Sequence, residues 1–316
     1  MINEEILMNK AARAQTKTQE ARHDRPEKVV YCAVSIDGDL RLGSHAQQKA
    51  GVRAMRRAHA ELGILGCTTW LINENDFHWT QLAPEILVGL AESGECIGIH
   101  DHLDTHYLED ESCERIHEFL SLSWRRLHEF YSRAGLNIRI LVHRNGSAHQ
   151  GQEIYRALGS MEYTILSDVW PGMKWYSRMV PTEHPLQPWK SLEDKDDPET
   201  IFTDNSRVPL MAVPWKHDAH NWLDVNSRSG RFLHVPITCL PWVERARVQT
   251  AVENSGNKVF LVIDTHPYNL QDPGSGDVSA ELVKDYCSTL KWIRDTYRAI
   301  FIRIDQIPQL MAAAFE

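Results

Sequence analysis

Side chains that can move protons or bind metal ions follow several short apolar runs of this sequence. Asp37 and Asp39 follow the first run, Arg144 and Asp168 follow later ones, and His266 follows the last long one. In α/β barrels and sheets, side chains at the carboxyl ends of separate strands converge on one site. Imidazoles and carboxylates serve both general acid–base catalysis and the binding of Zn²⁺-like ions. The pattern therefore predicts a metal-dependent catalytic site.

A histidine-rich segment after the third run offers candidate metal ligands. His102 and His106 are four residues apart, and a carboxylate from another strand would complete a set of three N/O ligands. Such a set leaves coordination positions open for water and substrate. His100 and His102 form a competing His-x-His pair. Spacing alone does not decide between the two pairs.

The elements that position these residues alternate along the chain. Short runs rich in β-branched residues predict strands at 29–36, 67–72, 96–100, 138–142, 163–166, 232–238 and 258–264, with 300–304 as a peripheral eighth. Helical patterns fall at 45–62, 83–92, 112–134, 150–158, 243–253 and 280–297. This alternation is typical of parallel strands joined by helical crossovers. We expect an α/β fold, a distorted seven-stranded (β/α) barrel.

The chain is expected to form one domain with two additions. Residues 1–28 are polar and form an N-terminal arm, and 29–316 hold the barrel. The segment of about 175–226 is rich in Pro, Trp, Asp and Lys and is too long for an ordinary connection, so it is interpreted as a long insertion.

Composition restricts the partners and the compartment. A formal net charge of −9 argues against nucleic acid, whose phosphates need a basic surface. No apolar run is long enough to span a membrane, and the polar start lacks the apolar core of a signal peptide. Six scattered cysteines without a CxxC pair fit a reducing compartment. A cytoplasmic protein is expected.

The motifs resemble those of the polysaccharide deacetylase family, carbohydrate esterase family 4 with the NodB homology domain, over about residues 29 to 305. Ser-Ile-Asp37-Gly-Asp39 is similar to the first motif in its divergent Asp-x-Asp form, and His102 to His106 is similar to the His-x-x-x-His motif. His-Arg144-Asn-Gly resembles the third motif, and Leu261 to His266 resembles the last.

This resemblance implies a role for each residue. Asp39, His102 and His106 would hold a divalent ion, with Zn²⁺ favoured, and Asp37 would be the general base. His266 would protonate the leaving amine. Arg144 would pair with Asp37, and Asp168 would accept a hydrogen bond from His266, with Asp264 as the second choice for that role.

The expected activity is a metal-dependent amide hydrolase that removes an acyl group from an N-acylated amino sugar. Since no export signal is visible, a small-molecule or a lipid- or nucleotide-linked substrate of surface glycan (O-antigen) synthesis is favoured over a cell-wall polymer. One alternative is a hydrolase of a non-sugar linear or cyclic amide on the same fold. Another is a sugar-binding pseudoenzyme. Trp170, Trp215, Trp222 and Tyr268 are candidate walls for a sugar ring.

Overall fold

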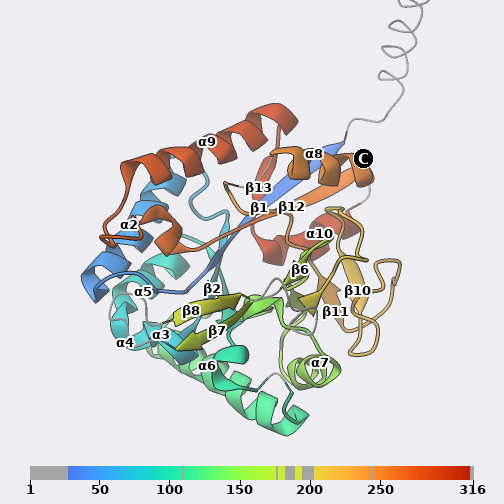
Figure 1. Cartoon of the computed structure of the whole chain (residues 1–316), viewed down its shortest axis with the longest axis horizontal. Coiled ribbons are helices and arrows are strands. Elements are labelled where there is room, and N and C mark those ends of the chain that lie inside the picture. Colours follow the sequence, from blue (N-terminus) through green and yellow to red (C-terminus); the bar gives the residue numbers. More distant parts are fainter. Residues whose placement is uncertain are drawn as a thin grey trace, which may run out of the picture.

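A curled, mostly parallel sheet runs through the protein (Figure 1). The computed structural model describes residues 28–108, 110–175, 177–181, 189–193, 203–242 and 245–313. Nine strands form the sheet in the order β10-β11-β5-β4-β3-β2-β1-β12, with β13 also beside β1. They are β1 (Val29–Asp37), β2 (Thr68–Ile72), β3 (Cys96–Asp101), β4 (Val142–Asn145), β5 (Ile165–Leu166), β10 (Trp215–His217), β11 (Phe232–His234), β12 (Lys258–Thr265) and β13 (Ile300–Ile302). All neighbours are parallel except β10 and β11.

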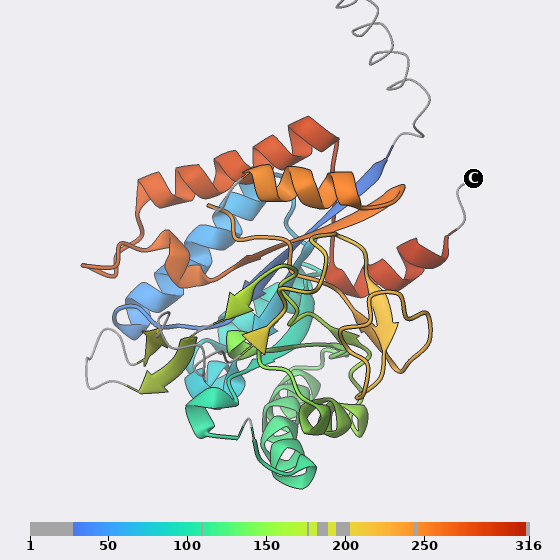
Figure 2. The same cartoon turned by 45° about the vertical axis from the view of Figure 1, so that its right-hand side comes forward.

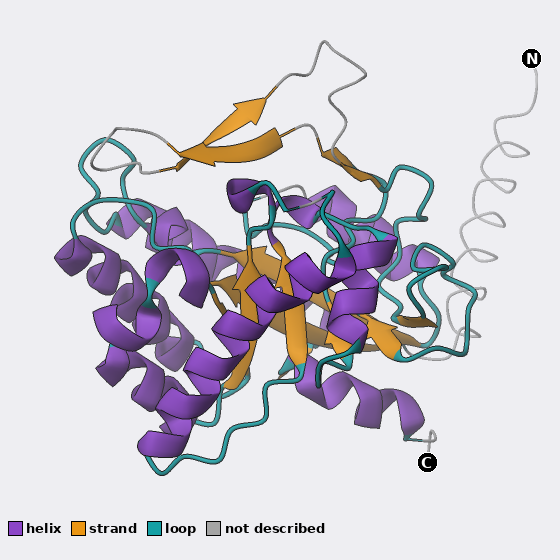
Figure 3. Cartoon of the chain, turned by 90° about the horizontal axis from the view of Figure 1, so that it is seen from below, coloured by secondary structure: helices purple, strands orange, loops and turns teal. Residues whose placement is uncertain are grey.

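Helices surround this sheet, which Figure 3 shows in the interior of the protein. The described helices are α2 (His45–Glu61), α3 (Glu74–Phe77), α4 (Trp79–Leu82), α5 (Pro84–Glu92), α6 (Cys113–Arg133), α7 (Gln152–Gly159), α8 (Arg245–Asn254), α9 (Ala280–Tyr297) and α10 (Ile307–Ala312). Short 3₁₀ turns are η1 (Asp104–His106), η2 (Gly146–Ala148), η4 (Pro267–Leu270) and η5 (Ile304–Gln306).

Local signals explain where the long helices begin and which side they bury. Ser44 caps α2 through a reciprocal capping box with Gln47. The Ser112 hydroxyl accepts a hydrogen bond at the start of α6, and this helix buries Ile116, Leu120 and Leu127 at helical spacing. The predicted helices of the outer layer are thus present, with ends that differ by a residue or two.

The sheet curls far enough for its two ends to approach each other. Thr238 donates its backbone N–H to Val262 of β12 at 2.9 Å, and Asp264 donates to the Cys239 carbonyl at 2.9 Å. On the other side of this segment, Ile237 donates to the Val169 carbonyl at 2.9 Å. The chain that follows β11 therefore links β12 to the segment after β5. The α/β, barrel-like architecture is confirmed as a curled half-barrel of mostly parallel strands, and seven-fold closure remains an expectation.

One predicted strand lies several residues away from its expected position. The sequence predicts a strand at 138–142, whereas β4 is Val142–Asn145 and pairs with β3 so that Arg144 lies opposite His100. The prediction followed the apolar residues, but the ladder continues through polar side chains that are buried and hydrogen-bonded. Arg144 is thus a strand residue rather than a loop residue.

The predicted insertion of about 175–226 contains small strands of its own. β6 (Lys174–Trp175) pairs with β9 (Thr203–Asp204), and β7 (Ser177–Pro181) pairs with β8 (Trp189–Glu193), both antiparallel. β7 lies close to η1. Figure 2 shows β7 and β8 as a pair of arrows at one edge of the protein. The rest of this segment up to residue 202 and the predicted arm, except Lys28, lie outside the described residues. In the part of the chain that the structure describes, no helix has the length and apolarity to cross a bilayer.

Candidate metal centre and catalytic pocket

The inner face of the curled sheet changes from apolar to polar toward the carboxyl ends of its strands. Because strand side chains alternate between faces, every second residue lies on this inner side. Along β1 the order is Ala33, Ser35, Asp37, and along β12 it is Val262, then Asp264. The same alternation leads from Val142 to Arg144 in β4 and from Cys96 to His100 in β3. The site therefore lies directly above the apolar interior of the half-barrel.

Three buried side chains form a cluster that could hold a metal ion: Asp39, His100 and His102. The Nε2 atoms of the two imidazoles are 3.0 Å apart. Oδ2 of Asp39 lies 3.3 Å from Nε2 of His102 and 3.7 Å from Nε2 of His100. With metal–ligand bonds of about 2.0–2.2 Å, the edges of a ligand tetrahedron measure about 3.3–3.6 Å. The three distances bracket that value, so the donor set fits a Zn²⁺-like ion.

The hydrogen bonds around the cluster leave the correct ring nitrogens available. Nδ1 of His102 lies 3.1 Å from the Asp104 carboxylate, which can only accept, so Nδ1 carries a proton and, in the neutral ring, Nε2 has the lone pair. Nδ1 of His100 is buried, has no hydrogen-bond partner, and lies 3.8 Å from Oδ2 of Asp37. A proton on that Nδ1 likewise leaves Nε2 of His100 facing the other two donors.

His106, one of the three predicted ligands, lies outside this cluster of described residues, and His100 lies within it. His100 and His102 share the inner face at strand spacing, whereas the chain then turns into η1 and carries His106 away. Nε2 of His106 lies 2.8 Å from Asp76, and its side chain is 36% exposed. Asp76 accepts from Asn73, which donates to Oδ1 of Asp39 at 2.9 Å. His106 is thus linked to the cluster indirectly, through Asp76 and Asn73.

Asp37 lies beside the cluster and is held by a buried guanidinium. Arg144 donates to Oδ1 of Asp37 at 2.8 Å and also to Asp264, with further hydrogen bonds to Ser35 and Ser167. Burial alone would raise the pKa of Asp37, but the charges of Arg144 and the nearby histidines outweigh it and keep this pKa below its usual value. The expected contact between Arg144 and Asp37 is present, and the carboxylate stays ionised.

Asp264 differs from Asp37 although both contact Arg144. Burial and the negative charge of Asp37 raise the pKa of Asp264 to about 7, despite the attraction of Arg144. Two carboxylates that share one guanidinium do not both ionise readily. Asp37 is therefore the charged member of the pair near neutral pH.

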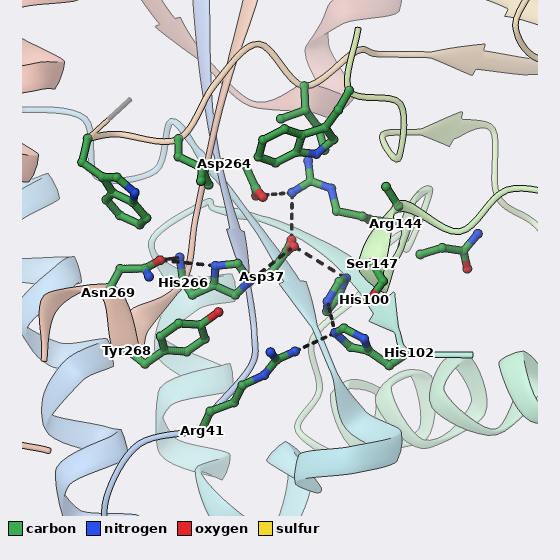
Figure 4. Close-up of a pocket in the computed structure, with 16 residues that line it drawn as sticks. Asp37, Arg41, His100, His102, Arg144, Ser147, Asp264, His266, Tyr268 and Asn269 are labelled. Atoms are coloured by element: carbon green, nitrogen blue, oxygen red, sulfur yellow. Dashed lines mark hydrogen bonds and ion pairs between the residues drawn. The ribbon is translucent and has the colours of Figure 1, made fainter. Parts of the chain in front are cut away.

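His266 directly follows β12 and faces the cluster, with Nε2 at 3.8 Å from Asp37 and 3.8 Å from Asp39 (Figure 4). Its orientation comes from Asn269, whose Oδ1 accepts the His266 backbone N–H at 2.7 Å and lies 3.2 Å from Nδ1. Because the backbone N–H identifies that atom as oxygen, Nδ1 carries a proton and Nε2 faces the site with its lone pair. Burial lowers the pKa of His266 to about 4.

Asp168, predicted to accept a hydrogen bond from His266, lies beside His234 instead. Ser167 lies on the inner face next to Arg144, so Asp168 points to the opposite side of the sheet. There its carboxylate lies 3.1 Å from Nε2 of His234 and accepts from Tyr155 and Asn145. Asp264, the second choice, bonds to Arg144 and Ser35. Asn269 orients His266 instead. Its position three residues after His266 in the sequence was the signal that could have identified it.

Replacement of Asp168 by Asn is expected to reduce stability and leave metal binding unchanged. It removes the charge that pairs with His234, at a cost of about 2–3 kcal/mol in the free energy of unfolding. The His234 charge helps hold the pKa of Asp168 below its usual value despite burial, so this stabilisation is present above about pH 4 and shrinks as the pH falls further. Urea unfolding at several pH values measures it. If Asp168→Asn were as stable as the wild type but had lost turnover, a catalytic role for Asp168 would be supported.

The His102 ring lies so close to Gly146 of the third motif that no larger residue fits at this position. A Cβ added at Gly146 would lie 2.2 Å from Nδ1 of His102, and that ring is held between Asp104 and Asp39. We therefore expect Gly146→Ala to displace the ring and weaken metal binding by about 10–100-fold, the range for altered outer-shell support. A chelator competition assay measures the affinity. Gly256→Ala, where an added Cβ meets nothing within 4 Å and the backbone is not in the left-handed region, is a control for folding. Equal affinities of the wild type and Gly146→Ala would refute the steric argument.

A cavity of about 190 Å³ opens above these groups. Its polar floor contains Asp37, His100 and Arg144, and Trp170, Ile237 and Leu240 form an apolar side. Figure 4 shows Tyr268 and Arg41 at this pocket. Of the four aromatic residues proposed as walls, Trp170 and Tyr268 line the cavity.

The other two proposed wall residues lie elsewhere. Trp215 stacks on the His234 ring and donates to the carbonyl of Trp222. Trp242, which the sequence interpretation left out, lines the cavity and is 53% exposed. It follows no strand motif, so the pattern used for the other residues did not select it.

Comparisons with known proteins find similarity in fold at low sequence identity. No family model matches the chain, and no curated protein matches it. A solved structure from Bordetella bronchiseptica, described as a polysaccharide deacetylase involved in O-antigen biosynthesis, has 12% identity and a TM-score of 0.46 over 83% of this chain and 90% of its own. A lactam utilization protein from Thermus thermophilus has 13% identity and a TM-score of 0.34 over 87% and 99%. At these values, function has to be argued from the site itself.

Proposed function

We propose that this protein is a metal-dependent amide hydrolase that removes an acyl group from an N-acylated amino sugar. The observation that carries the proposal is the buried cluster of Asp39, His100 and His102 beside the ionised Asp37. Two imidazoles and one carboxylate suit Zn²⁺ and related divalent ions and leave coordination positions open. When bound, such an ion would activate water and polarise the amide carbonyl.

The residues around the cluster supply a route for the proton. Asp37, kept charged and oriented by Arg144, takes a proton from the attacking water as its oxygen bonds to the carbonyl carbon. Nε2 of His266 lies 3.8 Å from Asp37 and has a lone pair in the neutral ring, so it can receive that proton. It then passes the proton to the amide nitrogen as the carbon–nitrogen bond breaks. The products are a carboxylic acid and a free amine.

The cavity and the motifs together support the proposed substrate class. The apolar side formed by Trp170, Ile237 and Leu240 suits a short acyl chain, and the exposed Trp242 offers an aromatic face for a sugar ring. The resemblance of the motifs to polysaccharide deacetylases favours an amino sugar. A nucleotide- or lipid-linked sugar of surface glycan synthesis is the version that we propose.

A substrate screen on metal-loaded protein tests this proposal. N-acetylated and N-formylated amino sugars, free and nucleotide-linked, are compared with linear amides and with cyclic amides and imides, and the released acid is measured. Release from the sugars supports the proposal. Turnover of cyclic amides alone would mean that the protein is an amide hydrolase with a different substrate class. Metal and sugar binding without any turnover would indicate a binding protein.

A further inference from the structure

Arg41 occupies a position that the proposed mechanism does not use. It follows Asp39 by two residues, and its Nη2 contacts Oδ2 of Asp39 and lies 2.8 Å from Nε2 of His102. Figure 4 shows the guanidinium directed at the His102 ring. These two atoms are also two of the three donors of the candidate metal centre. One protein cation therefore contacts the same atoms that would bind the metal ion.

The two uses of these atoms exclude each other. A neutral imidazole has a single nitrogen lone pair, so Nε2 of His102 can accept a hydrogen bond from Arg41 or bind a metal ion, but not both. An ion at about 2.0–2.2 Å from Nε2 of His102 and Oδ2 of Asp39 would also lie within about 5 Å of Nη2 of Arg41, which contacts both of these atoms. Two cations at that separation repel each other strongly. Arg41 has to move when the metal ion binds.

The surroundings allow that movement without unfolding. The Arg41 side chain is 15% exposed and lines the cavity, and its guanidinium lies 5.7 Å from the centre of the Tyr268 ring. An aromatic face stabilises a nearby cation, so the side chain can turn toward the cavity and keep a favourable neighbour. This movement breaks the buried ion pair of Arg41 with Asp39 and its hydrogen bond to His102.

We propose that Arg41 is a positioning residue that competes with the metal ion for Asp39 and His102 and thereby sets the metal affinity of the protein. The proposal rests on the metal centre of the proposed function. In the metal-free protein, Arg41 neutralises the buried carboxylate of Asp39 and keeps the donors together. Breaking these contacts subtracts from the free energy of metal binding. Removing the guanidinium is therefore expected to tighten metal binding, whereas loss of an ordinary structural residue would weaken it.

The test compares Zn²⁺ dissociation constants of the wild type, Arg41→Gln, Arg41→Lys and Arg53→Gln by competition with a chromophoric chelator. Arg53 lies on α2, is 55% exposed and pairs with Glu85, so its variant controls for the loss of one positive charge. We expect Arg41→Gln to bind Zn²⁺ at least about tenfold more tightly, equivalent to about 1.4 kcal/mol. Arg41→Lys should fall between it and the wild type, and Arg53→Gln should match the wild type within about twofold.

Thermal unfolding gives a second measurement that does not depend on activity. Arg41→Gln should melt below the wild type without metal, and saturating Zn²⁺ should raise its melting temperature by more. Equal or weaker Zn²⁺ binding by Arg41→Gln would overturn the proposal while leaving the metal centre intact. If metal-free Arg41→Gln does not fold, the Zn²⁺ affinity of Arg41→Lys tests the proposal instead. An affinity equal to that of the wild type would then overturn it. A wild type that binds no divalent ion would overturn the metal centre as well.

Discussion

Replacement of Asp37 by Asn is expected to abolish hydrolysis while the metal ion stays bound. Asn has nearly the same shape and keeps an oxygen for Arg144, so the buried network at 2.8 Å is preserved. It cannot take a proton from water, and loss of a general base costs about 10²–10⁴-fold in rate. We expect a fall of about 10³-fold or more in kcat, measured with the best substrate of the screen, at an unchanged metal content.

Asp264→Asn is the matched control, because Asp264 bonds to the same guanidinium. Burial and the charge of Asp37 raise the pKa of Asp264 to about 7, so near neutral pH it already carries a proton part of the time. No contact joins Asp264 to His266 among those that the structure describes, whereas Asp37 lies 3.8 Å from Nε2 of His266. We expect at most about a tenfold loss in this variant. Full activity of Asp37→Asn together with an inactive Asp264→Asn would exchange the roles of the two carboxylates.

The fold was largely predictable because the strands lie in the interior of the protein. β1 and β12 are buried along almost their whole length, so they stand out as β-branched runs such as VVYCAVSI. The pattern was least informative where the sheet carries polar residues. Arg144 belongs to β4 because Asp37, Asp264 and two serines satisfy its guanidinium, and these partners come from distant parts of the chain.

The candidate site was predictable in its location and partly in its residues. Residues two apart on a strand share a face, and this rule alone would pair His100 with His102 and separate Asp168 from Ser167. The spacing of His102 and His106 is helical, but the chain between them follows a 3₁₀ turn. Arg41 could not have been foreseen, since its position depends on how the loop after β1 folds back over the cluster.

The ligand set itself gives the second large effect: His100→Ala is expected to lose the metal ion, and His106→Ala is expected to keep it. Nε2 of His100 lies 3.0 Å and 3.7 Å from the other two donor atoms, so its removal leaves two ligands. The loss of affinity should exceed about 100-fold, the upper end for changes outside the ligand set. His106 contacts Asp76, which is linked to Asp39 through Asn73, so about a tenfold loss is the most that we expect.

Metal analysis after gel filtration, followed by chelator competition, distinguishes the two variants. Circular dichroism of the metal-free proteins controls for folding, because His100 is buried and His106 is partly exposed. The reverse result, metal lost with His106→Ala and retained with His100→Ala, would require η1 to rearrange on binding. The ring of His106 would then have to leave Asp76 and turn inward past Thr105, whose hydroxyl donates to the His102 carbonyl at 2.8 Å. Because that hydrogen bond and the Asp76 contact both hold η1 in place, we expect His100, and not His106, to bind the metal ion together with Asp39 and His102.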